Sequence, residues 1–131
     1  MNRIDTDILE EPKVIYDLKE RTKKFALDGI IFAASLPKHG TGKIFAHQLV
    51  RAATSVGANY RAAALAQSKA SFIAKLSIAP EEVDETEYWL ELIRGAEIQT
   101  GDGLNDLITE ADELTRILAA SRIRARLNSE K

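Results

Sequence analysis

The sequence predicts an all-α protein, specifically an up-down-up-down antiparallel four-helix bundle. Apolar residues recur at alternating spacings of three and four along four stretches of the chain, which is the period of a helix with one buried stripe. Short segments rich in helix breakers separate these stretches, so neighbouring helices are expected to run antiparallel. No β-branched run alternates with polar residues as a strand would. The length of 131 residues suits one domain.

The first helix is predicted from Lys13 to Leu36, where Pro37 opens a breaker-rich segment that ends at Gly42. Its buried stripe is Ile15, Leu18, Thr22, Phe25, Gly29, Phe32 and Leu36. The expected organisation of the whole chain has three parts: a flexible arm at residues 1–12, the bundle at 13–127 and a frayed tail at 128–131.

The second helix is predicted from Lys43 to Ala66 and is rich in small residues. Its stripe is Phe45, Leu49, Ala52, Val56, Asn59, Ala63 and Ala66. Gly57 lies in the helix interior, where glycine costs about 1 kcal/mol relative to alanine. We therefore expect either the close approach of another backbone or a local bend at Gly57.

The third helix is expected to begin near Ser68, a residue type favoured at N-caps. Pro80 lies inside it and removes one backbone hydrogen bond. Because the apolar stripe continues in phase beyond Pro80, a single kinked helix is favoured over two helices. The fourth helix is predicted from Leu104 to Arg126. The stripes of these two helices are Phe72, Leu76, Ala79, Val83, Thr86, Leu90 and Ile93, and then Leu104, Leu107, Ala111, Leu114, Leu118, Ser121 and Ala125.

The composition excludes several classes of function. Cysteine is absent, so the chain has no disulfide, no thiol nucleophile and no thiolate metal site. No apolar run is long enough to span a bilayer, and the first residues lack the apolar region of a secretory signal. We therefore expect no membrane partner and a cytoplasmic location.

The net charge of -2 conceals a strong pattern along the chain. Residues 1–80 carry a balance of +5, residues 81–113 carry -11, and residues 114–131 carry +4. One interpretation is attraction between antiparallel helices of opposite charge. The other is a basic surface that meets a polyanion or an acidic partner.

No residue pattern indicates an enzyme, and no cofactor or metal is expected. The segment from Lys38 to Lys43 lacks the first glycine and the hydroxyl residue of a phosphate-binding loop, and no strand precedes it. His39 and His47 lack the Glu-x-x-His spacing of metal-binding bundles. The acidic residues at 81–87 spread over more than one helix face, and no nucleophile accompanies them.

Two polar residues of the second helix are expected to have structural roles, as is Gly57. Asn59 stands on the buried stripe, where an unpaired amide would cost about 1–3 kcal/mol. A register-fixing network with a polar core residue such as Thr22 is therefore expected, and a polar pocket or a subunit contact is the alternative. Arg51 is expected to form a salt bridge with a carboxylate of the third helix, such as Glu85.

Three segments together resemble a known family. The run from Gln48 to Ala62, the segment Phe72–Leu76 and the segment Asp84–Leu92 are similar to the signature of the bacterial four-helix bundle family of 23S rRNA intervening-sequence proteins. The similarity extends over about residues 14–125. It implies a four-helix bundle that forms ring-like homopentamers. It also implies a relation to the accessory protein of diversity-generating retroelements, which binds a reverse transcriptase and nucleic acid.

Two functions are open at this point. In the first, the protein is a non-enzymatic homo-oligomer, with a pentamer favoured by the resemblance, and its acidic third helix meets a basic surface of a neighbouring subunit. Ile78, Trp89 and Leu92 would then anchor the interface. In the second, the protein is an RNA- or DNA-binding accessory factor with a basic surface centred on the second helix. The phosphate contacts would come from Lys38, Lys43, Arg51, Arg61, Lys69 and Lys75.

Overall fold

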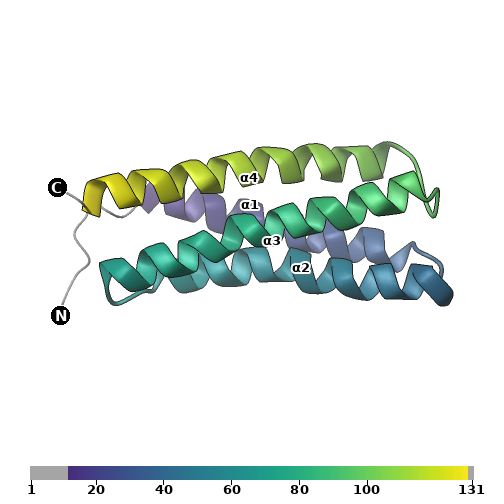
Figure 1. The fold of residues 1–131 in the computed structure, drawn as a ribbon, viewed down its shortest axis with the longest axis horizontal. Coiled ribbons are helices and arrows are strands. Elements are labelled where there is room, and N and C mark those ends of the chain that lie inside the picture. Colours follow the sequence, from purple (N-terminus) through teal and green to yellow (C-terminus); the bar gives the residue numbers. More distant parts are fainter. Residues whose placement is uncertain (1–11, 130–131) are drawn as a thin grey trace.

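The computed structural model describes residues 12–129 and contains, in that range, four helices and no strand. The helices are α1 (Pro12–Ala34), α2 (Gly40–Ala64), α3 (Lys69–Gly95) and α4 (Asp102–Ser129). Helices that follow one another in the chain lie side by side and antiparallel (Figure 1), so the predicted four-helix bundle is confirmed. None of these helices is long and apolar enough to cross a membrane.

The helix boundaries differ from the predicted ones at a few residues. Helix α2 begins at Gly40 rather than Lys43, and α4 continues to Ser129, beyond the predicted end at Arg126. Helix α3 runs without interruption through Pro80. The predicted arm lies outside the described residues, apart from Pro12, which is the first residue of α1.

The two glycines in the first turn of α2 have a structural explanation. Gly40 has a φ of +61°, a left-handed conformation that favours glycine. At Gly42, a Cβ atom would lie 2.5 Å from the carbonyl oxygen of Pro37, so no side chain fits there. Gly40 and Gly42 therefore allow a tight connection from α1 into α2.

Most residues of the predicted stripes form the core, whereas Ile15, Phe45 and Ala66 are only partly buried and α2 shows one shift. Large apolar residues of all four helices are almost fully buried and pack into a single cluster, which includes Phe25, Leu49, Leu76, Leu90 and Leu118. In α2, Tyr60 is buried with 2% exposure, whereas the neighbouring Asn59 is only half-buried. The prediction that Asn59 is a core residue is therefore wrong.

Helices α1 and α2 approach each other closely at two glycines. A Cβ atom on Gly29 of α1 would lie 3.0 Å from the Cβ atom of Ala53 in α2. A Cβ atom on Gly57 of α2 would lie 3.2 Å from Oγ1 of Thr22 in α1. The close approach expected at Gly57 is thus present, and glycine is used on both helices to allow it.

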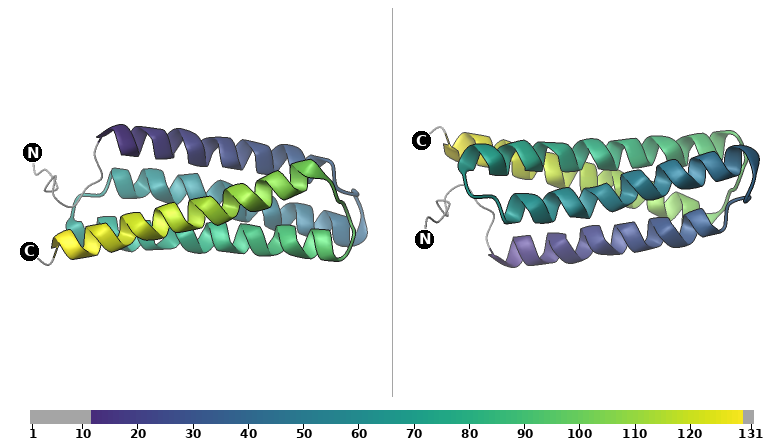
Figure 2. Two further views of the ribbon diagram at one scale, coloured as in Figure 1. Left: turned by 90° about the horizontal axis from the view of Figure 1, so that it is seen from above. Right: turned by 90° about the horizontal axis from the view of Figure 1, so that it is seen from below.

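Helices α1 and α4 are the least closely packed of the neighbouring pairs. Figure 2 shows the axis of α4 inclined to that of α1, so the two helices do not pack along their whole length. Near the middle of the bundle, Arg21 of α1 bridges to Glu110 and Glu113 of α4. This side of the bundle is consequently the most open one.

The contact between α1 and α2 leads to a prediction on stability. Replacing Gly29 with valine forces a branched side chain against Ala53, and overpacking of this kind typically costs about 1–3 kcal/mol. We expect the free energy of unfolding, measured by urea denaturation, to fall by that amount. The matched control is Gly103→Val in α4, where nothing lies within 4 Å of the new Cβ atom. That variant should change stability by no more than about 0.5 kcal/mol, and equal effects at both glycines would contradict the close contact.

Candidate functional site

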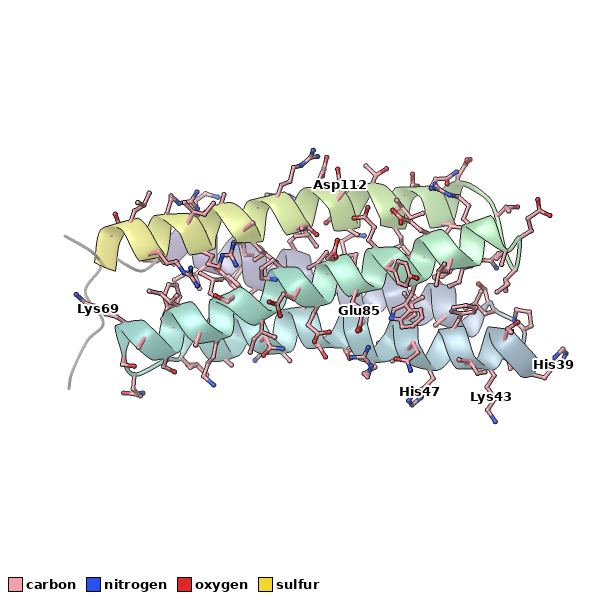
Figure 3. The ribbon with its side chains drawn as sticks, viewed as in Figure 1. His39, Lys43, His47, Lys69, Glu85 and Asp112 are labelled. Atoms are coloured by element: carbon pink, nitrogen blue, oxygen red, sulfur yellow. The ribbon has the colours of Figure 1, made fainter. Side chains whose placement is uncertain are left out.

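The basic residues predicted to bind nucleic acid do not gather on one surface. Lys43 lies at one end of the bundle and Lys69 at the opposite end (Figure 3). Lys38 belongs to the connection before α2, and its Nζ donates a hydrogen bond to the carbonyl oxygen of Ala34. Arg61 lies in the last turn of α2, at the end of the bundle where α3 begins. The six residues are therefore spread along the length of the bundle.

Arg51 is engaged within its own chain. Its guanidinium forms the expected ion pair with Glu85 of α3 and lies 3.7 Å from Oε2 of Glu82, while its Nε donates to Gln48. Burial is the main cause that raises the pKa of Glu82, the nearby carboxylate of Glu85 raises it further, and Arg51 lowers it. Arg51 thus links α2 to α3, and its charge is largely compensated there.

The polar residues of the stripes form no network between helices. The side chains of Asn59, Thr22 and Thr86 each donate a hydrogen bond to a carbonyl oxygen one turn earlier on their own helix. The expected pairing of Asn59 with a polar residue of another helix is thus wrong, because the amide group is already satisfied by the carbonyl oxygen of Ser55 at 2.8 Å. The contact of Thr22 with α2 is instead the packing contact at Gly57.

The predicted interface anchors differ in their environments. Trp89 is half-buried and packs against Phe45 of α2, with ring centroids 5.9 Å apart. Its Nε1 has no hydrogen-bond acceptor among the described residues. Leu92 is also half-buried, and Ile78 is exposed several turns earlier on α3. Trp89 therefore contributes to the packing of α2 on α3, and the three residues do not form one exposed patch.

The antiparallel hairpin of α3 and α4 brings the acidic halves of both helices together. Glu87 of α3 shows the consequence, because its pKa is raised first by burial and then by the negative charges of Glu91 and Asp112. Asp112 lies on α4 (Figure 3), where it also pairs with Arg116. Residues 81–113, which carry a charge balance of -11, are thus folded back on themselves by the hairpin.

This acidic hairpin is compensated from its two outer neighbours. Arg51 of α2 reaches the carboxylates of α3, and Arg21 of α1 reaches those of α4. Arg21 donates to Glu110 from both Nε and Nη2, at 2.8 and 2.6 Å, which is the bidentate geometry of strong Arg–carboxylate pairs. These hydrogen bonds raise the pKa of Arg21, so it stays charged. Attraction between helices of opposite charge is therefore present, through one arginine on each side.

A groove of about 630 Å³ lies between the second half of α1 and the first half of α4. Phe25, Phe32 and Leu107 supply apolar surface in its lining. Four charged residues also line it, of which three are acidic: Lys24, Asp28, Asp106 and Glu110. Since Lys24 pairs with Asp28 and Arg21 pairs with Glu110, Asp106 supplies the negative charge that remains among these lining residues. The groove is a candidate binding site that sequence reasoning missed, because it depends on how far α4 stands from α1.

A cluster of apolar side chains continues from this groove onto the outer face of α1. Leu27, Ile30 and Ile31 are 50%, 42% and 69% exposed, and Ile31 also lines the groove. Residues three and four apart are neighbours on a helix surface, so the three side chains are adjacent. This cluster could have been recognised from the sequence, because its three residues are apolar and lie beside the buried stripe of α1.

Within residues 12–129, no group of histidine and carboxylate side chains is arranged to hold a metal ion. His39 precedes α2 without capping it through its side chain, and His47 points away from the bundle (Figure 3). The groove and the outer face of α1 are therefore the candidate binding surfaces that the described residues offer.

Comparisons with known proteins agree with this architecture. The family model of the 23S rRNA-intervening sequence proteins matches residues 16–120. A crystal structure of a protein of unknown function from the S23 ribosomal protein family of Bacteroides thetaiotaomicron is similar to the chain, with 33% sequence identity and a TM-score of 0.74. The similarity covers 82% of this chain and 96% of the other. None of the curated proteins matches.

Because the pKa of Glu87 is raised, we expect the ionisation of Glu87 to make the free energy of unfolding depend on pH. The folded state holds the proton of Glu87 more tightly than the unfolded state, in which the pKa is near its ordinary value of 4.5. Stability is therefore lost as the pH rises through 4.5 toward the raised value, and the ionised carboxylate is unfavourable at pH 7. We expect Glu87→Gln to raise the free energy of unfolding at pH 7, and the gain to shrink as the pH falls below 4.5. Urea denaturation over this pH range measures it.

The control for this experiment is Glu20→Gln, which removes an exposed carboxylate from α1. A gain at Glu87 that persists unchanged at low pH would show that loss of charge is not its cause.

Proposed function

This chain belongs to the 23S rRNA-intervening sequence protein family, and on that premise we propose that it is a non-enzymatic interaction protein of the cytoplasm that works as a homo-oligomer. The observation that carries the proposal is the exposed apolar cluster of Leu27, Ile30 and Ile31 on the outer face of α1. Contiguous apolar surface on a soluble protein typically marks an interaction site. Resemblance to the family favours five copies in a ring.

The stability of the single bundle does not account for this cluster. The core is already filled from all four helices, and the three side chains lie outside it. Burial of apolar surface contributes about 25 cal/mol per Å², so covering these side chains favours association. A second copy of the chain is the partner that is always present at the same concentration as the chain itself.

A second candidate function is the binding of RNA or DNA, as an accessory factor to an rRNA intervening sequence or to a reverse transcriptase. The observation that favours it is a gathering of basic residues at one end of the bundle. Arg61 lies in the last turn of α2 there, Lys69 begins α3, and the last turns of α4 carry Arg122, Arg124 and Arg126. Tyr60 and Phe72 are buried, so they are not available to stack on bases. Contacts to phosphates would therefore dominate the affinity.

The homo-oligomer is tested by light scattering coupled to size exclusion at micromolar concentration. We expect a mass several times that of the 14.5 kDa chain, with five copies favoured. The double variant Leu27→Glu/Ile30→Glu should dissociate the assembly while it keeps its helical circular dichroism spectrum, since both residues are exposed. A wild-type protein that is a monomer under these conditions would exclude the proposed function.

The nucleic-acid function is tested by titrating a labelled, structured RNA at low salt and again at about 0.2 M salt. Counterion release predicts that several phosphate contacts lose affinity by about 10³-fold over such a range. We expect Arg61→Glu/Lys69→Glu to weaken binding strongly, whereas Lys38→Glu/Lys43→Glu at the opposite end is the matched control. If the two double variants bind equally, the basic end of the bundle is not the binding surface.

A further inference from the structure

The end of the bundle at which α2 ends, α3 begins and α4 ends is positively charged (Figure 1). Helix α2 has no acidic residue, α3 has none before Glu81, and α4 has none after Glu113. Arg61, Lys69 and Arg122 form no ion pair with a described residue. Nε of Arg122 is buried and has no hydrogen-bond acceptor among the described residues. This end therefore has room for an acidic partner.

Helix α4 extends past the start of α1. Arg21 of α1 pairs with Glu113 of α4, which fixes the level at which these antiparallel helices meet. Nine residues separate Arg21 from Pro12, the first residue of α1, and the ninth residue after Glu113 is Arg122. Residues 123–129, about two turns, therefore lie beyond the start of α1, and we call them the α4 end. All views in Figures 1 and 2 show α4 projecting in this way.

The α4 end presents apolar surface. Ile123 and Leu127 are 52% and 58% exposed and stand four residues apart, so they are adjacent on one face of the helix. Arg124 lies between them in the sequence and donates a hydrogen bond to Ser121 of the same helix. The α4 end thus combines an exposed apolar pair with the positive charge around it.

The eleven residues that precede α1, which we call the N-terminal segment, have the matching composition. They carry four carboxylates and one arginine, and three of them are large and apolar: Ile4, Ile8 and Leu9. The segment joins α1 at Pro12, beside the α4 end. An extended chain places Ile8 up to about 14 Å from Pro12, and Ile4 up to about 28 Å. Packed helices lie about 8–10 Å apart and are about 10–12 Å across, so the segment is long enough to cross α4.

Charge favours this segment as the partner of the basic end. The described carboxylates of α1 nearest to this end are Asp17 and Glu20, and Asp17 is held by Lys13. The N-terminal segment brings four more carboxylates to the same place, because it comes directly before α1. Complementary charge of this kind orients a contact, and the apolar side chains supply its burial.

We propose that the N-terminal segment docks on the α4 end of its own chain, with Ile8 and Ile4 over Leu127 and Ile123. Its carboxylates then lie over the basic end and shield it from polyanions. This shielding rests on the second candidate function, whereas the docking itself does not. Both the segment and the α4 end lie outside residues 16–120, which the family model matches, so family membership does not imply the contact.

The docking is tested by disulfide formation, for which this chain is well suited because it contains no cysteine. The test variant is Ile8→Cys/Leu127→Cys. The matched control is Ile8→Cys/Leu65→Cys, since Leu65 is 73% exposed and directly follows α2 at the same end of the bundle. Both variants are oxidised at high dilution and compared on non-reducing gels. Circular dichroism checks that each is folded.

We expect a disulfide within one chain that forms about tenfold faster in the test variant than in the control. A tethered but undocked thiol has an effective concentration of about millimolar at any site within its reach, so it would react at similar rates in both. Equal rates would therefore overturn the docking. A disulfide that forms mainly between two chains would also overturn it, because the segment would then cover another copy.

The shielding is tested with the labelled structured RNA at about 0.1 M salt. Deletion of residues 1–11 should raise its affinity about tenfold, the low end of what local surface charge produces. The control removes the same number of carboxylates from the other half of the bundle, where charges more than about 10 Å away are screened at this salt. It consists of four exposed positions: Glu81→Gln, Asp84→Asn, Glu91→Gln and Asp106→Asn.

The control should change the affinity for RNA by no more than about twofold, since its charges are screened from the basic end. An equal gain in the control and in the shortened chain would assign the effect to net charge and overturn the shielding. RNA that binds neither the whole chain nor the shortened one would remove the second candidate function and the shielding together. The disulfide rates decide the docking in either case.

Discussion

The close contact of α1 with α2 is the constraint on which the rest of this bundle depends. Gly29 meets Ala53 and Gly57 meets Thr22, so neither helix carries a side chain that would hold the backbones apart. Helix α1 therefore packs firmly on α2, and it packs far less closely on α4. A bundle with equal packing on all four sides would have no groove, so the main candidate binding surface is a consequence of small residues on the opposite side of α1.

Ion pairs connect α1 to α4, where the packing between the helices is sparse. The antiparallel hairpin of α3 and α4 concentrates carboxylates, and the pKa of Glu87 is raised there first by burial and then by the negative charges of Glu91 and Asp112. Arg21 and Arg51 bring positive charge to the two outer edges of this hairpin, and Arg21 does so across the side of the bundle with the least apolar contact. Part of the link between α1 and α4 is thus ionic, which leaves the groove beside it accessible.

The polar and apolar side chains of the bundle differ in how far they are presented to a partner. The buried hydroxyl groups of Thr22 and Thr86 are satisfied within their own helices, so they are not presented to a ligand. Exposed apolar side chains lie on several helices, and those of α1 include the adjacent Leu27, Ile30 and Ile31.

The sequence by itself determined the fold class, the order of the helices, most of the core residues and the family, because helical periodicity and breaker residues are local signals. It also contained the ion pair of Arg51 with Glu85, since both residues flank their stripes at matching levels. The sequence could not decide which of Asn59 and Tyr60 is buried in the core. That helix packs on both α1 and α3 and buries a wide arc, in which alanine and glycine carry no hydrophobic signal.

Only the tertiary structure decided where the bundle is open. The groove depends on the distance between α1 and α4, and no pattern within either helix reports the distance to the other. Likewise, the acidic block becomes a repulsive hairpin only once the connection between α3 and α4 folds it back on itself. Distances between helices depend on which side chains meet across an interface, and periodicity along one chain specifies faces but not the partners that cover them.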